Sequence, residues 1–331
     1  MARADLIINL VRSSISGDAS TLRRTVEAII AEERSKQHNV MADKMEKLLE
    51  ANPTAGATNL VRLVSEQTSR AKDYIAEIAP KRTLGDLTLP ETSRLAIEQL
   101  IEEQTRASLL RSHSIEPRHK ILLIGPPGNG KTSLAEAIAE SLSLPLFVVR
   151  YESMIGSFLG ETASRLKRVF DYVRTTPCVL FFDEFDALGK ERGDQHETGE
   201  IKRVVTSLLM QIDDLPSYVV VVTATNHPEL LDKAVWRRFQ LRLKLPAPTH
   251  KALVNFLDAL SRKTGHELGM KAELVAKALG KVSFSEAEEF FMDTIRRRIL
   301  SMEDRTSPQI VKEQLKLWAM RSESSGKSSG R

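Results

Sequence analysis

The fold class is decided by one stretch of sequence, Ile121-Leu122-Leu123-Ile124-Gly125-Pro126-Pro127-Gly128-Asn129-Gly130-Lys131-Thr132. Its second part has the pattern of a glycine, four residues and then Gly-Lys-Thr. The four apolar residues in front predict a buried strand, and the residues from Lys131 to Leu142 predict a helix. A strand, such a loop and a helix in direct succession predict a phosphate-binding loop at the edge of a parallel sheet.

The residue types in this loop suit the β- and γ-phosphates of ATP. Glycines let backbone N–H groups converge on phosphate oxygens, and the helix N-terminus adds a positive dipole end. Lys131 is expected to reach the phosphates, and the Thr132 hydroxyl is expected to bind Mg²⁺. The residues expected to contact the nucleotide are Pro127, Gly128, Asn129, Gly130, Lys131, Thr132 and Ser133. The alternative, a glycine-rich turn with an incidental lysine, does not account for the strand and helix on either side.

Further apolar runs follow the loop and alternate with helical patterns. Strands are expected at 146–149, 179–182, 219–222 and 241–245, which with 121–124 make five. Continuous apolar strands interleaved with helices predict a parallel sheet covered on both faces. Beyond residue 248 only helical patterns follow, at about 249–263, 270–280, 284–301 and 308–320. The expected fold is therefore α/β, a P-loop NTPase with a five-stranded parallel sheet and a helical domain after it.

The N-terminal part of the chain has a different character. Apolar residues recur at helical spacing within 3–51, and turn residues close that segment at 52–56. Residues 57–85 are polar and mixed and predict a partly helical linker, after which Pro90 starts a long helix to about Arg111. The expected domains are 1–52, a small helical domain; 53–85, a linker; 86–247, the α/β domain; 248–321, the helical domain; and 322–331, a disordered tail.

Polar residues follow two of the expected strands. Asp183 and Glu184 come directly after 179–182, and Asn226 comes after the strand that begins at 219. Because parallel strands end at one edge of a sheet, these side chains are expected beside the phosphate loop. Asp183 is placed to bind Mg²⁺ and Glu184 to activate the attacking water, which favours ATP hydrolysis. Asn226 taken alone is more typical of a turn, but its place in the strand order favours contact with the same water.

Taken in order, these motifs resemble those of the AAA+ ATPases over roughly residues 85–320. Within that family they are similar to the AAA subgroup that includes katanin, spastin and related hexameric remodellers. The run Leu231–Phe239 resembles the arginine-finger segment of the family. The resemblance implies that Arg237 and Arg238 act on ATP held by a neighbouring subunit of a homo-hexamer, whereas read alone such a pair is surface charge.

A second resemblance concerns the substrate. Ser157–Glu161 resembles the family's first pore loop, which implies that Phe158 and Leu159 grip an extended polypeptide in a central channel. Read alone, both residues are typical of the buried start of a helix. Residues 189–199 are polar and correspond to a second pore loop. The stretch from Val282 to Glu288 departs from the family pattern, because it lacks both of the glycines usual at the start of the third lid helix.

Composition excludes several other classes of protein. The 331 residues carry a net charge of only +4 and are 41% hydrophobic, which is typical of a globular protein with an ordinary solvated surface. No apolar run approaches the roughly 18–20 residues that span a bilayer. One cysteine and the absence of a secretory signal indicate a cytoplasmic protein. The seven histidines show no metal-ligand spacing.

The sequence therefore predicts an ATP- and Mg²⁺-dependent hexameric protein remodeller that threads polypeptide through a pore. A nucleic-acid-handling loader or helicase is the alternative, disfavoured because Phe158 and Leu159 are apolar where basic residues would suit a nucleic acid. A scaffold that hydrolyses ATP slowly to switch its assembly is a third hypothesis. The small N-terminal domain resembles those of AAA proteins encoded beside subtilisin-like proteases, which implies an adaptor that recruits a protease or another partner.

Overall fold

The computed structural model describes residues 6, 8–11, 13, 19–35, 42–43, 45–46, 73–150, 159–186, 198–231, 233–301 and 307–326. The chain divides into two compact units, 1–73 and 74–331, and each is described by itself. In the first unit, helix α2 (Ala19–Ser35) buries Ile29 and Ile30 on one face. This is the amphipathic arrangement that the helical spacing of its apolar residues predicts.

The second unit is built on a sheet of six strands in the order β1-β3-β4-β5-β2-β6. Its strands are β1 (Ile75–Ile78), β2 (Lys120–Ile124), β3 (Leu146–Val149), β4 (Cys178–Phe182), β5 (Val219–Thr225) and β6 (Leu241–Lys244). The five strands from β2 to β6 pair in parallel, as expected. The sixth, β1, lies at one edge and pairs antiparallel with β3, which corrects the expected number of strands.

Strand β1 falls where the sequence predicts a partly helical linker. Its sequence Ile-Ala-Glu-Ile has no long apolar run, so the local pattern gives little indication of a strand. Pairing with β3, which places Ile75 opposite Val149, supplies the missing stabilisation. Ile75 is buried against the sheet, whereas Ile78 at the other end is exposed. Contacts distant in sequence therefore override the local preference at this edge.

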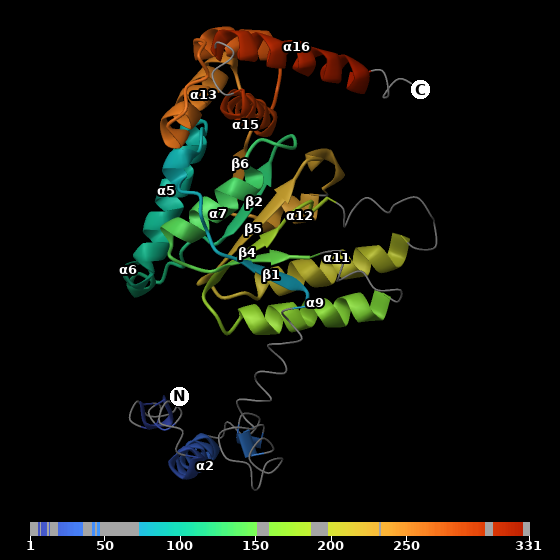
Figure 1. Ribbon diagram of the computed structural model, residues 1–331. Helices are drawn as coiled ribbons and strands as arrows, with labels where there is room; N and C mark the ends of the chain where they lie inside the picture. The colour runs from blue at the N-terminus through green and yellow to red at the C-terminus, as the bar shows by residue number, and fades with distance from the viewer. Residues whose placement is uncertain are drawn as a thin grey trace. The chain divides into compact units, whose positions relative to one another are not determined.

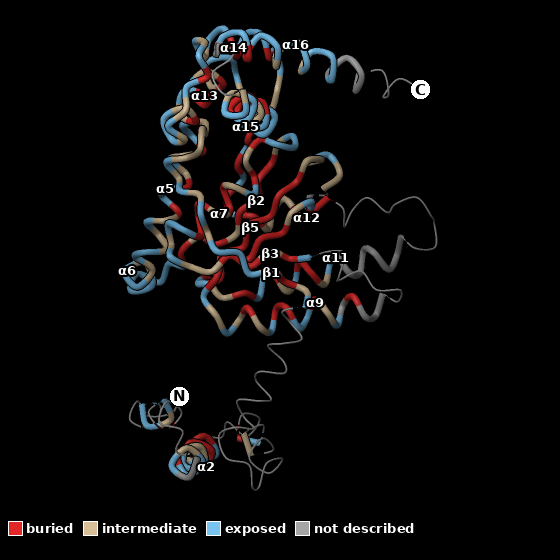
Figure 2. The backbone as a smooth tube through the Cα atoms, in the orientation of Figure 1, coloured by how far each residue is buried: buried red, intermediate tan, exposed pale blue. Residues whose placement is uncertain are grey.

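Helices cover both faces of the sheet (Figure 1). On one face pack α5 (Glu91–Thr105) and α7 (Lys131–Ser141), and on the other α9 (Leu159–Val173) and α11 (Thr198–Asp213). Successive side chains of β2 alternate between the two cores, because neighbouring residues of a strand point to opposite faces. Figure 2 shows the two central strands, β4 and β5, buried throughout. The short helix α6 (Ala107–Ser112) continues from α5 after a break at Arg106, where one long helix was expected.

The four expected C-terminal helices are present. They are α13 (His250–Thr264), α14 (Ala272–Leu279), α15 (Phe284–Leu300) and α16 (Ser307–Gly326), and they enclose a core of their own that includes Leu257, Phe291 and Val311. The last helix continues through 322–326, which were expected to be part of a disordered tail. Residues 327–331 lie outside the described residues.

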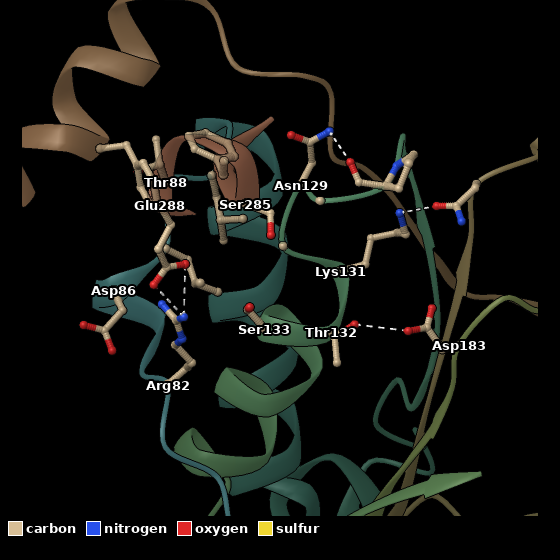
Figure 3. Close-up of a pocket in the computed structure, with 18 of the residues that line it drawn as sticks. Arg82, Asp86, Thr88, Asn129, Lys131, Thr132, Ser133, Asp183, Ser285 and Glu288 are labelled. Carbon is tan, nitrogen blue, oxygen red and sulfur yellow. Dashed lines mark hydrogen bonds and ion pairs between the residues drawn. The ribbon is translucent and has the colours of Figure 1, made fainter. Parts of the chain in front are cut away.

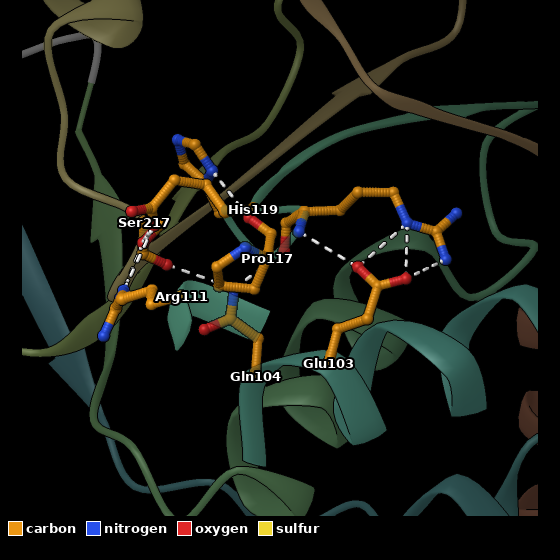
Figure 4. Close-up of polar contacts among 8 residues, drawn as sticks. Glu103, Gln104, Arg111, Pro117, His119 and Ser217 are labelled. Atoms are coloured by element: carbon orange, nitrogen blue, oxygen red, sulfur yellow. Dashed lines mark hydrogen bonds and ion pairs between the residues drawn. The ribbon is translucent and has the colours of Figure 1, made fainter. Parts of the chain in front are cut away.

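A network of polar contacts fixes the amino-terminal edge of the sheet (Figure 4). The Glu103 carboxylate on α5 accepts bonds from the Arg118 side chain at 2.9 Å and from its backbone N–H at 3.0 Å. The Gln104 amide donates to the Arg118 carbonyl at 2.7 Å and to the Ser217 carbonyl at 3.1 Å. Arg118 precedes β2 and Ser217 precedes β5, so one helix holds the starts of both strands. We call these contacts the α5 brace.

The single cysteine, Cys178, is the first residue of β4 and is fully buried. Burial raises the pKa of its thiol to about 12. Among the helices that the structure describes, none is both long and apolar enough to cross a membrane.

Candidate active site

The phosphate loop lies between β2 and α7, as the sequence predicts. It leaves the end of β2 at Gly125, whose N–H donates to the Thr225 carbonyl at 3.2 Å. Gly130, immediately before α7, has a φ of +84°, a left-handed conformation that glycine adopts without strain. The first backbone N–H groups of α7 are therefore presented at the carboxyl edge of the sheet, where an anion is favoured.

Lys131 is buried, and its ammonium is held by three acceptors. It donates to the Gly125 carbonyl at 2.7 Å, to the Pro126 carbonyl at 3.0 Å and to the Asn226 Oδ1 at 2.5 Å. Burial lowers the pKa of Lys131, while the carboxylates of Asp183 and Asp186 act in the opposite direction. The ammonium thus lies at the start of α7 with the polar end of β5 beside it.

The expected metal-binding pair is assembled at the ends of β4 and the loop. The Thr132 hydroxyl donates to Asp183 Oδ2 at 3.2 Å, and Asp183 Oδ1 accepts the Glu184 N–H at 2.9 Å. Glu184 has a φ of +47°, which is uncommon for a residue with a side chain and is typical of functional sites. Both carboxylates line the same cavity as the loop.

This cavity has a volume of about 360 Å³ and lies between the sheet edge and the C-terminal helices (Figure 3). Every residue expected to contact the nucleotide lines it, together with Asp183, Glu184 and Asn226. Its far side is formed by residues that the sequence did not single out. They come from the segment before α5 and from two C-terminal helices, and are Arg82, Asp86, Leu87, Thr88, Leu89, Phe256, Phe284, Ser285 and Glu288.

The segment 79–90, here called the strap, is tied to the helices around it. Glu136 of α7 accepts the backbone N–H groups of Lys81 and Arg82, at 2.6 and 3.2 Å. The Arg82 guanidinium pairs with Glu288 of α15 at 3.1 Å, and Asp86 pairs with Lys263 of α13 at 2.8 Å. The hydrogen bond from Lys263 holds the pKa of Asp86 below its ordinary value. The strap therefore connects the P-loop helix to the C-terminal helical domain.

The C-terminal domain also contacts the phosphate loop directly, although it lacks the glycines of the family pattern. The Ser285 N–H donates to the Gly128 carbonyl at 3.0 Å. A side chain at Gly128 would lie 2.7 Å from the Ser283 hydroxyl. Ser283 caps α15 reciprocally with Glu286, which fixes where this helix begins. The capped start of α15 thus lies beside the phosphate loop, in the stretch where the family pattern has glycines.

The two arginines lie away from this cavity. Both are at the end of α12 (Lys233–Arg238), where Arg237 is exposed and has no polar partner among the described residues. Arg238 pairs with Asp213 and donates to the Leu209 carbonyl at 3.3 Å. Asp213 in turn pairs with Lys120, the first residue of β2, at 3.1 Å. Because the phosphate loop follows the last residue of that strand, roughly 13 Å away, Arg238 is at the opposite edge of the sheet.

The substrate-loop predictions cannot be placed in the structure. Phe158 and residues 189–197 lie outside the described residues, and Leu159 is described only as the first residue of α9. Residues 198–199, the last two of the second expected loop, begin α11.

The cavity fits ATP and Mg²⁺. Its volume is within the range of sites for small ligands, and a helix N-terminus with a buried lysine suits a polyphosphate. A hydroxyl and a carboxylate oxygen are the hard ligands that Mg²⁺ prefers, and the ion usually completes its shell with water and substrate phosphates. Within the described residues, no cluster of three or more His, Cys, Asp or Glu side chains offers a site for a metal bound by protein alone.

Comparison with known proteins bears on the same region. Residues 121–247 match the family model described as "ATPase family associated with various cellular activities (AAA)". An uncharacterized AAA family ATPase, y4kL of Sinorhizobium fredii, is 36% identical over 302 residues, which are 91% of this chain and 90% of that protein. The peroxisomal ATPase PEX6 of Kluyveromyces lactis is 35% identical over 66% of this chain, and that of Saccharomyces cerevisiae is 35% identical over 60%.

The match to y4kL extends over nearly the whole of both chains, whereas this chain spans less than a quarter of the length of either PEX6 protein. The phosphate loop, the match to the AAA family model and the match to y4kL agree on the chemistry, which is hydrolysis of ATP. The chain belongs to the AAA family of ATPases.

Proposed function

We propose that the protein forms a ring, a homo-hexamer, in which each ATP is hydrolysed between two subunits and the energy is used to pull on a polypeptide. The observation that carries this proposal is the position of the arginine pair. Arg238 is linked through Asp213 to the start of β2, while the phosphate loop follows its end. An arginine so placed does not serve its own loop, but in a closed ring it faces the loop of a neighbour.

Within one subunit, the contacts support the following roles. Lys131 and the N-terminal turn of α7 would hold the phosphates, and Thr132 with Asp183 would hold Mg²⁺, which would neutralise charge that develops on the phosphate oxygens. Glu184 orients the attacking water and accepts its proton, since it lines the cavity directly after Asp183. Asn226, beside Lys131, holds the same water from the end of β5.

A mixing experiment tests whether the arginine acts between subunits. Arg237→Ala and Glu184→Gln should each abolish turnover while ATP still binds, because each removes one group needed only for hydrolysis. When the two inactive proteins are mixed and allowed to exchange subunits, interfaces that combine Glu184 of one with Arg237 of the other should regain activity. Arg237 is the better choice than Arg238, because Arg238 also holds α11 within its own chain.

Two results would contradict the ring. The mixture could stay as inactive as its parts, which would place both groups in one subunit. Alternatively, the protein with ATP could remain a monomer by light scattering at concentrations where it is fully active. Either result would leave the assignment of ATP hydrolysis standing and would rule out the trans arrangement.

The polypeptide substrate is proposed from Phe158 and Leu159. Unfolded protein should stimulate ATP hydrolysis, and Phe158→Ala should lose that stimulation while Phe158→Tyr keeps it, since an aromatic ring is enough for non-specific grip. Stimulation by DNA alone, lost at high salt, would instead identify a nucleic-acid-handling enzyme.

The helical unit at the N-terminus is proposed as an adaptor that brings a cytoplasmic partner, a protease for instance, to the ring. In its first described residues, Ile8 and Val11 are exposed apolar side chains. Affinity purification of the full chain, compared with a variant carrying Ile8→Asp and Val11→Asp, tests this role. Recovery of the same protein partner with both would argue against it.

A further inference from the structure

One buried carboxylate beside the site has no role in the function proposed above. Asp186 lies in the turn that follows β4 and is only 4% exposed. It does not line the cavity, although Asp183 and Glu184 of the same turn do. A buried carboxylate is unfavourable unless hydrogen-bond donors surround it. The hydrogen-bond donors around Asp186 therefore indicate which part of the structure this carboxylate stabilises.

Among the described residues, the two hydrogen-bond donors to Asp186 come from the end of β5 and the residue after it. The Thr225 hydroxyl donates to Oδ1 at 2.8 Å, and the Asn226 backbone N–H donates to the same oxygen at 3.3 Å. Thr225 is itself fully buried, and its hydroxyl oxygen accepts the His227 N–H at 3.0 Å. One carboxylate oxygen thus holds the Asn226 N–H directly and, through the Thr225 hydroxyl, the N–H of His227.

The turn that carries Asp186 is in turn fixed to the same strand. The Phe185 N–H donates to the Ala224 carbonyl at 2.8 Å, and the Phe185 ring is buried in the core beneath the sheet. Asp186 is therefore held against β5 by the residue before it. The backbone of Asn226 has little freedom to shift relative to Asp183 and Glu184.

The side chain of Asn226 leads from this anchor to the phosphate loop, because its Oδ1 accepts the Lys131 ammonium at 2.5 Å. A chain of contacts runs from Asp186 through Asn226 to Lys131. We propose that Asp186 is a positioning residue, which acts on ATP hydrolysis by fixing the backbone of Asn226 so that its amide faces the reacting groups. This inference rests on the role in hydrolysis proposed for Asn226.

Two substitutions separate the effect of the Asp186 charge from the effect of its hydrogen-bond acceptor. Asp186→Asn keeps an oxygen in the place of Oδ1, so it should retain kcat within about five-fold of the wild type, because both bonds to β5 can still form. Asp186→Ala removes the acceptor, and kcat should fall on the order of 10²-fold, the loss typical of a misplaced catalytic group. The affinity for a fluorescent ATP analogue should change little in either variant.

A double-mutant cycle tests whether Asp186 acts through Asn226. Asn226→Ala should itself lower kcat on the order of 10²- to 10³-fold. If Asp186 works only by placing this residue, Asp186→Ala should have no further effect on kcat in the Asn226→Ala protein. Fully additive losses would overturn the proposal, and so would an unchanged kcat in Asn226→Ala.

Two further variants protect the experiment against a simple folding defect. Thr225→Val removes one of the two donors with little change in volume, and should lower kcat by less than Asp186→Ala and not at all in the Asn226→Ala protein. Asp214→Ala, which changes an exposed acid before β5, is the matched control and should leave kcat within about two-fold, the size of ordinary surface effects.

A fall in the thermal midpoint of Asp186→Ala with unchanged kcat would show that Asp186 has a merely structural role. Loss of ATP binding in Lys131→Ala separates the ATPase assignment from this test.

Discussion

Two glycines of the phosphate loop are needed for different physical reasons. A Cβ on Gly125 would lie 2.0 Å from the Leu245 carbonyl oxygen, a backbone atom that cannot move aside. A Cβ on Gly130 would meet nothing within 4 Å, but the backbone there has a φ of +84°. We expect Gly125→Ala to prevent folding of the second unit and Gly130→Ala to reduce the free energy of unfolding by only about 1–2 kcal/mol. Urea unfolding followed by circular dichroism measures both.

The matched control is Gly85→Ala in the strap. A Cβ there would lie 3.7 Å from the Thr83 hydroxyl, an ordinary contact, so its free energy of unfolding should stay within about 0.5 kcal/mol of the wild type. A Gly125→Ala protein as stable as this control would show that the end of β6 does not approach the loop so closely.

At the scale of elements, the strap joins the P-loop helix to the helical domain. Separating Arg82 from Glu288 should loosen the far wall of the cavity, because this pair and Asp86–Lys263 are the two ion pairs between the strap and the described C-terminal helices. We expect Glu288→Gln to speed the dissociation of ADP several-fold, measured by stopped-flow release of a fluorescent analogue. The phosphate contacts are untouched, so kcat should change less than the release rate.

A charge reversal makes this prediction specific. The double variant Arg82→Glu with Glu288→Arg should restore slow release, since the pair is re-formed with opposite sense, while each single reversal should release ADP fastest. Glu289→Gln is the control, because this neighbouring carboxylate is exposed and has no partner among the described residues. Equal release from Glu289→Gln and Glu288→Gln would contradict a role for the strap contact.

How much of this the sequence could predict depends on the range of the contacts involved. Strands β2 to β5 and the phosphate loop follow from continuous apolar runs and a local motif, so the ends of these strands are predicted to within three residues. Strand β1 depends on its pairing with β3, so the local sequence pattern did not predict it. The cavity wall from Phe256 and Glu288 likewise depends on where a distant domain packs. Asp186 was visible in the sequence as a further carboxylate three residues after Asp183, but the prediction of the site did not include it.

For the whole molecule, acid should act first at His119, the residue that directly follows Arg118 of the α5 brace. Burial lowers the pKa of His119 below its ordinary value of 6.5, so the unfolded chain takes up this proton at a higher pH than the folded chain. Neutral His119 therefore makes its full contribution to the free energy of unfolding above pH 6.5. This contribution declines as the pH falls from 6.5 towards the pKa of His119 in the folded protein. The Arg118 hydrogen bond lowers the pKa of Glu103, so its contribution is lost only below the ordinary glutamate value of 4.5.

The histidine contribution can be isolated by substitution. His119→Asn should flatten the fall in the urea midpoint between about pH 7.5 and about pH 5.5, because the buried titrating group is gone. His250→Asn, an exposed histidine at the start of α13, should leave the slope unchanged. Identical slopes in all three proteins would assign the acid sensitivity to other groups.

The burial of Cys178 makes the molecule convenient for labelling. Thiols react as thiolates, and a fully buried thiol with a pKa of about 12 presents almost none at neutral pH. Because the chain has no second cysteine, one introduced at exposed Glu289 would be the single site open to a maleimide dye. A protein with this one substitution can therefore report movement of its helical domain by fluorescence, and Cys178 in the core of the sheet need not be replaced.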